Sequence, residues 1–276
     1  CSLGRPSPDS RIRRTRLMRE TDTSYRQTAS LDESYWFQSQ RPLTALAFIA
    51  PLLVAYELGV LLLGPNAIRN GADVWLRQLL EVAGFGQYFL LPVLCICILL
   101  GWHYTTRQPW EVSWRVLQSM ACECVVLALL LRVILHIQSS LFDPALFSGE
   151  RAVPAALSVA SQETVRRLVG FLGAGVYEEL LFRLILFSSV AWFLRRLEAT
   201  HSVSIMIAAI ATSLFFATAH YIGPHAEPFH WQSQWFWFTF LFRTLAGIFF
   251  SALFVLRGFG IAAGTHAGYD ILVGLL

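Results

Sequence analysis

Long apolar segments dominate this chain and restrict it to one class of fold. They recur from residue 43 to the C-terminal residue, and several have the length that a helix needs to cross a bilayer. Their approximate bounds are 43–63, 88–101, 116–137, 168–194, 203–219, 235–256 and 259–276. With 55% hydrophobic and only 14% charged residues, the chain is too apolar for an ordinary soluble domain. We therefore predict an all-α, polytopic transmembrane helical bundle of about seven membrane helices, with a range of roughly six to eight.

The basic residues of the chain are all arginine, and lysine is absent. This excludes a Walker-type phosphate lysine, a Schiff-base lysine and a Ser-Lys dyad. Many of the arginines lie in residues 1–42, a polar stretch without apolar periodicity that we expect to be a disordered basic tail. Because this tail has no aromatic interleaving and no recognition motif, we expect no nucleic-acid partner and an attraction to anionic lipid instead.

The placement of arginine also predicts how the chain is oriented in the lipid bilayer. If the tail is cytoplasmic, the loops on its side of the membrane carry more arginines than the loops on the other side. Membrane proteins keep such an excess on the cytoplasmic side, so we predict a cytoplasmic N-terminus.

The chain divides into three predicted regions. Residues 1–42 form the tail, and residues 43–160 form accessory transmembrane helices and a linker rich in turn-forming residues. Residues 165–276 form the third region, which holds nearly all of the notable polar spacings. The ionisable groups in the helices of the second region are expected to make interhelical contacts; they are Glu57, Glu123 and Arg132.

Two adjacent carboxylates, Glu178 and Glu179, lie inside the apolar segment 168–194. A charge at the bilayer centre costs about 2.5–3.5 kcal/mol on insertion scales, so such residues usually face a protein interior and have a function. On a helix Glu179 can pair with Arg183, one turn later, whereas Glu178 points about 100° away and has no local partner. We therefore expect a structural role for Glu179 and a reactive one for Glu178.

Two further polar spacings lie on the helices that follow. One is Phe216-Ala-Thr-Ala-His220, near the end of the segment 203–219, and the other is His266-Ala-Gly-Tyr-Asp270, in the last segment. A four-residue spacing places the two members of each pair on one face of a helix. These faces can converge on a common cavity, with Phe216 in its wall or in the surrounding core.

These residue types together can perform hydrolysis of an acyl bond by water. Glu178 is a candidate general base, and His220 can share the water and move its proton because histidine titrates near neutrality. His266 and Asp270 can donate hydrogen bonds to a tetrahedral oxyanion. A serine nucleophile is not expected because G-x-S-x-G is absent, and neither Cys-x-Cys pair lies beside a histidine.

The three motifs, in this order on successive membrane helices, resemble the CPBP family. These are CAAX-processing and bacteriocin-processing intramembrane proteases, also called the Abi family, and the resemblance covers about residues 165–276. It implies an all-helical membrane fold with a conical intramembrane active-site cavity. It also implies peptide-bond hydrolysis like that of CAAX prenyl endopeptidases, with Glu178 and His220 activating water. His266 and the residue at position 270 would then form the oxyanion hole.

One position departs from the pattern of the well-studied prenyl-protein members of that family, which have asparagine where this chain has Asp270. An ionised aspartate repels an oxyanion, so Asp270 must either be protonated or orient His266. No asparagine follows Asn70 in the sequence, so we expect no nearby amide to substitute. Arg243, inside the segment 235–256, is expected to support the site by pairing with Asp270 or Glu179.

The resemblance implies a peptide or membrane-protein substrate. The absence of lysine is typical of a high-GC genome, and bacterial members lack prenylated CAAX substrates. We therefore expect a bacterial inner membrane and an unprenylated substrate, and the glutamate mechanism requires no cofactor.

Three other function classes stay open. A zinc-dependent, metalloendopeptidase-like membrane protease is one, because two histidines and a carboxylate can bind zinc. A proton-coupled transporter is another, since buried carboxylates and histidines can form a relay. The third is a non-catalytic membrane scaffold or bacteriocin-immunity protein.

Overall fold

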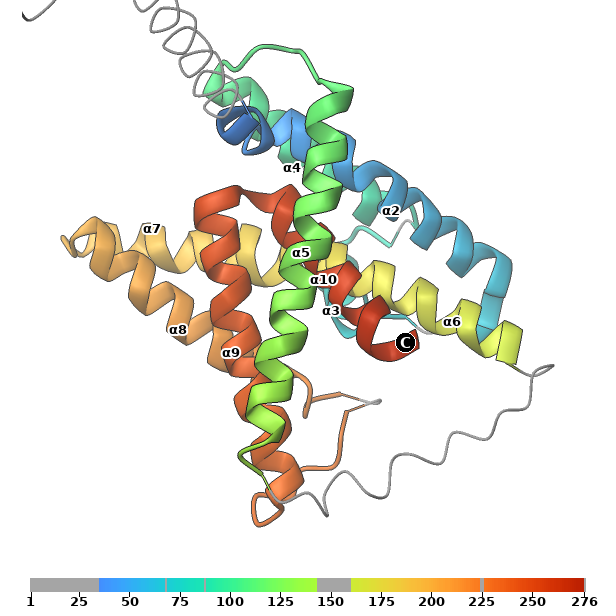
Figure 1. Cartoon of the computed structure of the whole chain (residues 1–276). Coiled ribbons are helices and arrows are strands. Elements are labelled where there is room, and N and C mark those ends of the chain that lie inside the picture. Colours follow the sequence, from blue (N-terminus) through green and yellow to red (C-terminus); the bar gives the residue numbers. More distant parts are fainter. Residues whose placement is uncertain (1–34, 68, 87, 143–159, 224–225, 276) are drawn as a thin grey trace, which may run out of the picture. The chain divides into compact units, whose positions relative to one another are not determined.

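The computed structural model describes residues 35–67, 69–86, 88–142, 160–223 and 226–275. Most of the predicted tail and most of the predicted linker therefore lie outside the described residues. The chain forms two units, Cys1–Gln38 and Ser39–Leu276. The second unit contains every helix that is labelled in Figure 1.

All regular elements of the described residues are helices, in agreement with the predicted all-α class. In chain order they are α2 (Pro42–Leu63), η1 (Gly64–Asn66), α3 (Gly71–Val82), α4 (Leu90–Thr106), α5 (Trp114–Ser139), α6 (Ala160–Gly173), η3 (Ala174–Glu178), η4 (Leu180–Phe187), α7 (Ser188–Arg196), α8 (His201–Ala219), α9 (Gln234–Arg257) and α10 (Phe259–Leu275). Each of the seven hydrophobic segments lies on one or more of these helices. The short helix α3 was not expected from the hydrophobic pattern.

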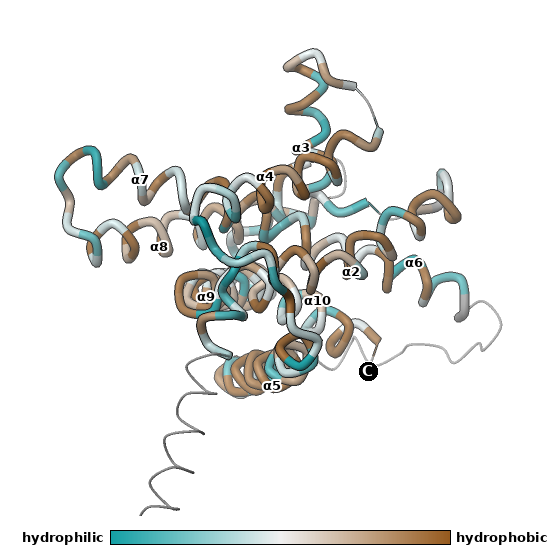
Figure 2. The backbone as a smooth tube through the Cα atoms, turned by 90° about the horizontal axis from the view of Figure 1, so that it is seen from above, coloured by the Kyte–Doolittle hydropathy of each residue, from teal (hydrophilic) through white to brown (hydrophobic). Residues whose placement is uncertain are grey.

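Four of the described helices, α2, α5, α8 and α9, are long and apolar enough to cross a membrane. In Figure 2, α5 and α9 are seen nearly end-on, and much of their visible backbone is coloured as hydrophobic. On α5 many of the exposed side chains are apolar, among them Val125, Val126, Leu129 and Leu130. Long helices that expose many apolar side chains suit a lipid environment, so the chain is a membrane protein. The total of about seven spans stays a prediction.

The segment predicted as one membrane helix, 168–194, is built from α6, η3, η4 and α7 in unbroken succession. The two central pieces are π-helical, with wider turns than an α-helix. Such turns are rare and often occur at functional sites. Glu178 ends the first of them, and Glu179 lies at the junction between the two.

The last helix, α10, packs against α5, α9, α2 and η3 (Figure 1). Small residues make this close approach feasible. A Cβ atom on Gly175 of η3 would lie 2.5 Å from the Cβ atom of Ala267 and 2.7 Å from its backbone nitrogen. A Cβ atom on Gly264 would lie 2.5 Å from the ring of Phe48 on α2. Close helix contacts through small residues are typical of membrane bundles, and here they bring His266 next to the two glutamates.

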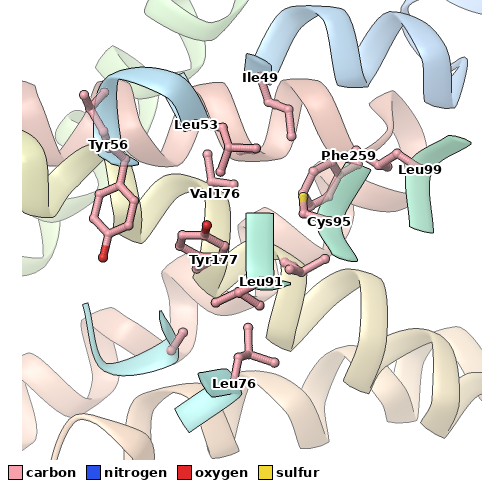
Figure 3. Close-up of a cluster of buried hydrophobic side chains, with 14 of the residues drawn as sticks. Ile49, Leu53, Tyr56, Leu76, Leu91, Cys95, Leu99, Val176, Tyr177 and Phe259 are labelled. Carbon is pink, nitrogen blue, oxygen red and sulfur yellow. The ribbon is translucent and has the colours of Figure 1, made fainter. Parts of the chain in front are cut away.

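A cluster of buried apolar side chains joins the first half of the chain to η3 (Figure 3). Leu53 on α2, Leu76 on α3, Leu91 on α4 and Phe259 on α10 belong to it, together with Tyr177 on η3. Tyr177 directly precedes Glu178, so the packing of α2, α3 and α4 helps to fix the position of the candidate base.

Candidate active site

Glu178 is 8% exposed, and its partners come from two distant parts of the chain. The side-chain nitrogen Nδ2 of Asn70 donates a hydrogen bond to Oε1 of Glu178 at 2.6 Å. The other oxygen, Oε2, lies 3.6 Å from Nε2 of His266. The expectation that Glu178 has no local partner fits this arrangement, because both contacts are made between different elements.

Asn70 corrects an expectation from the sequence. We expected no nearby asparagine to substitute for the one missing at position 270, because none follows Asn70 in the chain. Asn70 itself does lie close by, since it contacts Glu178 from 108 residues upstream. No local motif marks Asn70 as part of the site, because its position depends on how α3 packs against η3.

Glu179 and Arg183 form the predicted ion pair, with 3.3 Å between Oε2 and Nε. Both side chains are buried, and the contact lacks the alignment of a hydrogen bond, so charge attraction holds it. Arg183 also donates a hydrogen bond from Nη2 to the carbonyl of Gly247 on α9 at 3.1 Å. Its guanidinium carbon lies 4.8 Å from the ring centroid of Phe216. This pair therefore connects η4 with α8 and α9.

His266 is held by Glu179, a contact that the sequence did not predict. Nδ1 of His266 lies 2.7 Å from Oε1 of Glu179. A carboxylate accepts hydrogen bonds, so Nδ1 carries the hydrogen and donates it. Nε2 then faces Oε2 of Glu178 and also Oδ2 of Asp270, which is 3.7 Å away. The ring of Phe250 stacks on the imidazole with 4.4 Å between centroids.

His220 caps the C-terminal end of α8. Its Nδ1 lies 2.9 Å from the carbonyl oxygen of Phe216. The carbonyl can only accept, so Nδ1 is the donor, and Nε2 of the neutral ring is an acceptor. Phe216 is buried and its ring meets the imidazole edge-on at 4.9 Å. Burial lowers the pKa of His220 below its usual value, although the carboxylate of Glu178 acts in the opposite direction.

The cavity beside these residues has a volume of about 620 Å³. Glu178, His220 and Asp270 all line it, and so does Asn70. His266 and Glu179 are more deeply buried: His266 contacts the lining residues Glu178 and Asp270, and Glu179 contacts His266. The structure thus brings the four predicted catalytic residues into one region, with three of them in the cavity wall.

Arg243 has a different partner from the one we expected. It was predicted to pair with Asp270 or Glu179. Instead its guanidinium group makes an ion pair with Glu227, with Nη1 3.0 Å from Oε2, and it also donates to the hydroxyl of Tyr221 at 3.3 Å. Glu227 lines the cavity, so Arg243 supports the wall and does not contact the candidate catalytic carboxylates. Glu227 lies outside the regular helices, so no helical spacing predicts this pairing.

Several ionisable side chains converge here, and the zinc alternative needs a set of them with metal-binding geometry. Within the part of the chain that the structure describes, no group of three or more His, Cys, Asp or Glu side chains has that geometry. Nε2 of His266 faces two carboxylates, and its neighbour Glu179 occupies the other ring nitrogen. His266 therefore makes one hydrogen bond, to Glu179, and two longer charge contacts, to Glu178 and Asp270.

Comparison with known proteins identifies the family of this segment. Residues 160–272 match the model of the type II CAAX prenyl endopeptidase Rce1-like family. This confirms the resemblance that the three motifs indicated, and all three lie inside the matched residues. The match does not support the bacteriocin-processing (Abi) function that the resemblance also implied. No curated protein and no solved structure matches the chain.

Proposed function

We propose that this chain, whose residues 160–272 match the family of CAAX prenyl endopeptidases, is an intramembrane endopeptidase in which Glu178 and His220 activate water. One observation carries the proposal. Glu178 and His220 come from different helices, and they line the same cavity together with Asp270. A hydrolase of this kind needs a general base and a second group that holds the water, both facing one enclosed space. Glu178 and His220 in this cavity wall can supply these two functions.

The proposed reaction begins with a water molecule between Glu178 and His220. Oε2 of Glu178 takes a proton from the water, whose oxygen then forms a bond to the carbonyl carbon of the substrate peptide. The electron pair of the carbonyl double bond moves onto oxygen and gives an oxyanion. When the oxyanion collapses, the C–N bond breaks, and the leaving nitrogen receives the proton that Glu178 had taken.

The tautomer of His220 supports its part in this scheme. Its Nδ1 donates to the carbonyl of Phe216, so Nε2 keeps a lone pair for the water. A lowered pKa favours this neutral, proton-accepting form of the ring. His220 can therefore hold the water by accepting its second hydrogen while Glu178 takes the first.

Asp270 and His266 are proposed to stabilise the oxyanion. Asp270 lines the cavity, and in its protonated form it can donate a hydrogen bond. His266 lies directly behind Asp270 and Glu178, where it balances the charges of the carboxylates. Glu179 and Arg183 hold His266 from the protein side.

The proposed substrate is an unprenylated peptide or membrane protein that reaches the cavity within the lipid bilayer. We also propose a bacterial inner membrane with the N-terminus in the cytoplasm, on the basis of the arginine distribution. Residues 165–276 would form the protease core, with residues 43–160 as accessory helices and linker and residues 1–42 as a basic tail.

Comparative peptidomics of membranes tests the proposal. Membranes that contain the wild-type chain should yield cleavage products that are absent with Glu178→Gln or His220→Ala. Glu111→Gln is the matched control, because Glu111 is exposed in the loop between α4 and α5. Normal cleavage by a purified and well-folded Glu178→Gln variant would exclude Glu178 as the base.

A further inference from the structure

Asn70 makes two contacts that serve different parts of the protein. Its carbonyl oxygen Oδ1 accepts a hydrogen bond at 2.8 Å from the backbone N–H of Ala72, and so caps the first turn of α3. Its amide nitrogen Nδ2 donates to Oε1 of Glu178 at 2.6 Å. Asparagine is a favoured residue at the start of a helix. Capping uses only its Oδ1 atom, however, and does not account for the hydrogen bond that Nδ2 donates.

The two contacts together determine how the amide is oriented. The oxygen and nitrogen atoms of an asparagine amide have nearly the same shape, so their hydrogen-bond partners determine which position each atom occupies. The backbone N–H of Ala72 can only donate, so it requires the oxygen of Asn70 on its side. The nitrogen must then face Glu178, whose carboxylate is an acceptor.

The helix that carries Asn70 is itself fixed against η3. Asp73 on α3 accepts from Nε of Arg77 at 2.7 Å and from the hydroxyl of Tyr56 at 2.9 Å. Arg77 also pairs with Glu57 on α2 at 3.3 Å, and Glu57 accepts a hydrogen bond from Tyr177 on η3 at 2.5 Å. Because Tyr177 precedes Glu178, this buried network couples α3 and the candidate base through a second route.

We propose that Asn70 is a positioning residue for Glu178, supplied to the protease core by the accessory half of the chain. The proposal rests on the proposed function, in which Glu178 is the general base. The hydrogen bond from Asn70 occupies Oε1 and leaves Oε2 to take the proton from water. It also fixes the carboxylate in the cavity wall, where both residues lie. The family match begins at residue 160, so this contribution lies outside the matched segment.

Three substitutions separate this role from capping of α3. Asn70→Ser and Asn70→Asp both keep a good capping residue, but neither donates an amide hydrogen to Glu178. Serine is too short to reach Glu178, and aspartate places a second carboxylate against it. Asn70→Ala removes the cap and the donor together. Each variant is compared with wild type and Glu178→Gln, as the whole 276-residue chain in lipid nanodiscs.

Peptide cleavage is the first measurement. A hydrogen bond to a charged group typically contributes enough to change a rate by about tenfold or more. We expect kcat to fall by about that factor in Asn70→Ser, with KM and the unfolding temperature close to wild type. In Asn70→Asp we expect a larger fall in kcat. The acidic limb of its pH–rate profile should also move to higher pH, because adjacent carboxylates repel each other when both are charged.

Infrared spectroscopy gives a second measurement that does not depend on activity. The difference spectrum between wild type and Glu178→Gln isolates the carboxylate stretching bands of Glu178. We expect these bands to shift in Asn70→Ser, because the hydrogen bond to Oε1 is lost. Unchanged bands, or wild-type kcat in Asn70→Ser, would overturn the positioning role. Cleavage that survives Glu178→Gln would instead overturn the proposed function, whatever the spectra show.

Discussion

Glu179 and His266 are joined by a 2.7 Å contact between Oε1 and Nδ1, although they lie 87 residues apart in the chain. The contact makes Glu179 a bridge, since its other oxygen pairs with Arg183. One carboxylate thereby fixes a histidine on α10 and balances a buried cation on η4. The adjacent Glu178 has neither task and faces the cavity.

This difference predicts that substitutions at the two glutamates have different effects on stability. In Glu179→Ala the guanidinium of Arg183 loses its counter-charge while it stays buried. Breaking a buried pair in this way costs about 3–5 kcal/mol. We expect a marked fall in the unfolding temperature of Glu179→Ala in detergent, together with loss of cleavage.

Glu178→Gln provides the comparison for that measurement. Its side chain keeps its size, and its amide oxygen can still accept from Asn70, so we expect an unfolding temperature near wild type with cleavage abolished. Equal destabilisation by both substitutions would contradict the division of roles between the two glutamates.

Asp270→Asn tests how Asp270 acts. Glu179 already orients His266 through Nδ1, and Asp270 lies 3.7 Å from the other ring nitrogen. The orientation of the ring therefore does not depend on a charge at position 270. We expect Asp270→Asn to retain cleavage within about tenfold of wild type, since its amide can donate to an oxyanion.

Steady-state kinetics on Asp270→Asn and Asp270→Ala provide the check. Alanine has no donor, so its kcat should fall well below that of the asparagine variant. A complete loss of cleavage in Asp270→Asn would show that the carboxylate must act as an anion that holds His266.

The sequence was sufficient to predict the helical class, the family and the Glu179–Arg183 pair. Each of these depends on local information: apolar length, the order of short motifs, or a spacing of one helical turn. Asn70 and the bond between Glu179 and His266 were not predictable in this way. They depend on how α3 and α10 pack against η3, and for α10 this packing involves the small residue Gly175.

The partner of Arg243 illustrates the same limit. A cation inside an apolar segment is expected to pair with a buried carboxylate, and the motifs contain two candidates, Asp270 and Glu179. The chain instead supplies Glu227 from the region between α8 and α9. A single sequence carries no signal for this contact, because the region has no periodicity from which to place its side chains.

Treatment with a metal chelator distinguishes the proposed mechanism from a zinc protease. The described residues offer no group of three or more side chains with metal-binding geometry, so we expect cleavage to be unaffected by 1,10-phenanthroline or EDTA. The measurement is the cleavage rate of purified enzyme before and after chelation. Loss of activity that added zinc restores would identify a metalloprotease instead.

The contact between Gly175 and α10 predicts that one methyl group disrupts the site. In Gly175→Ala the new Cβ atom would lie 2.5 Å from Cβ of Ala267 and 2.7 Å from its backbone nitrogen. Helix backbones cannot yield as a flexible side chain can, so η3 and α10 must move apart. Overpacking of this kind typically costs about 1–3 kcal/mol. We expect a lower unfolding temperature and a fall in kcat, because Glu178 and His266 lie on these two elements.

Gly101→Ala is the matched control for that substitution. Gly101 lies within α4, and a Cβ atom there would meet nothing within 4 Å. Alanine is favoured over glycine inside a helix by about 1 kcal/mol, so Gly101→Ala should leave the unfolding temperature unchanged or raise it. Cleavage should also be unaffected, since α4 contributes no residue to the cavity wall. If Gly175→Ala behaved like Gly101→Ala in both measurements, close contact between η3 and α10 would not be what holds Glu178 beside His266.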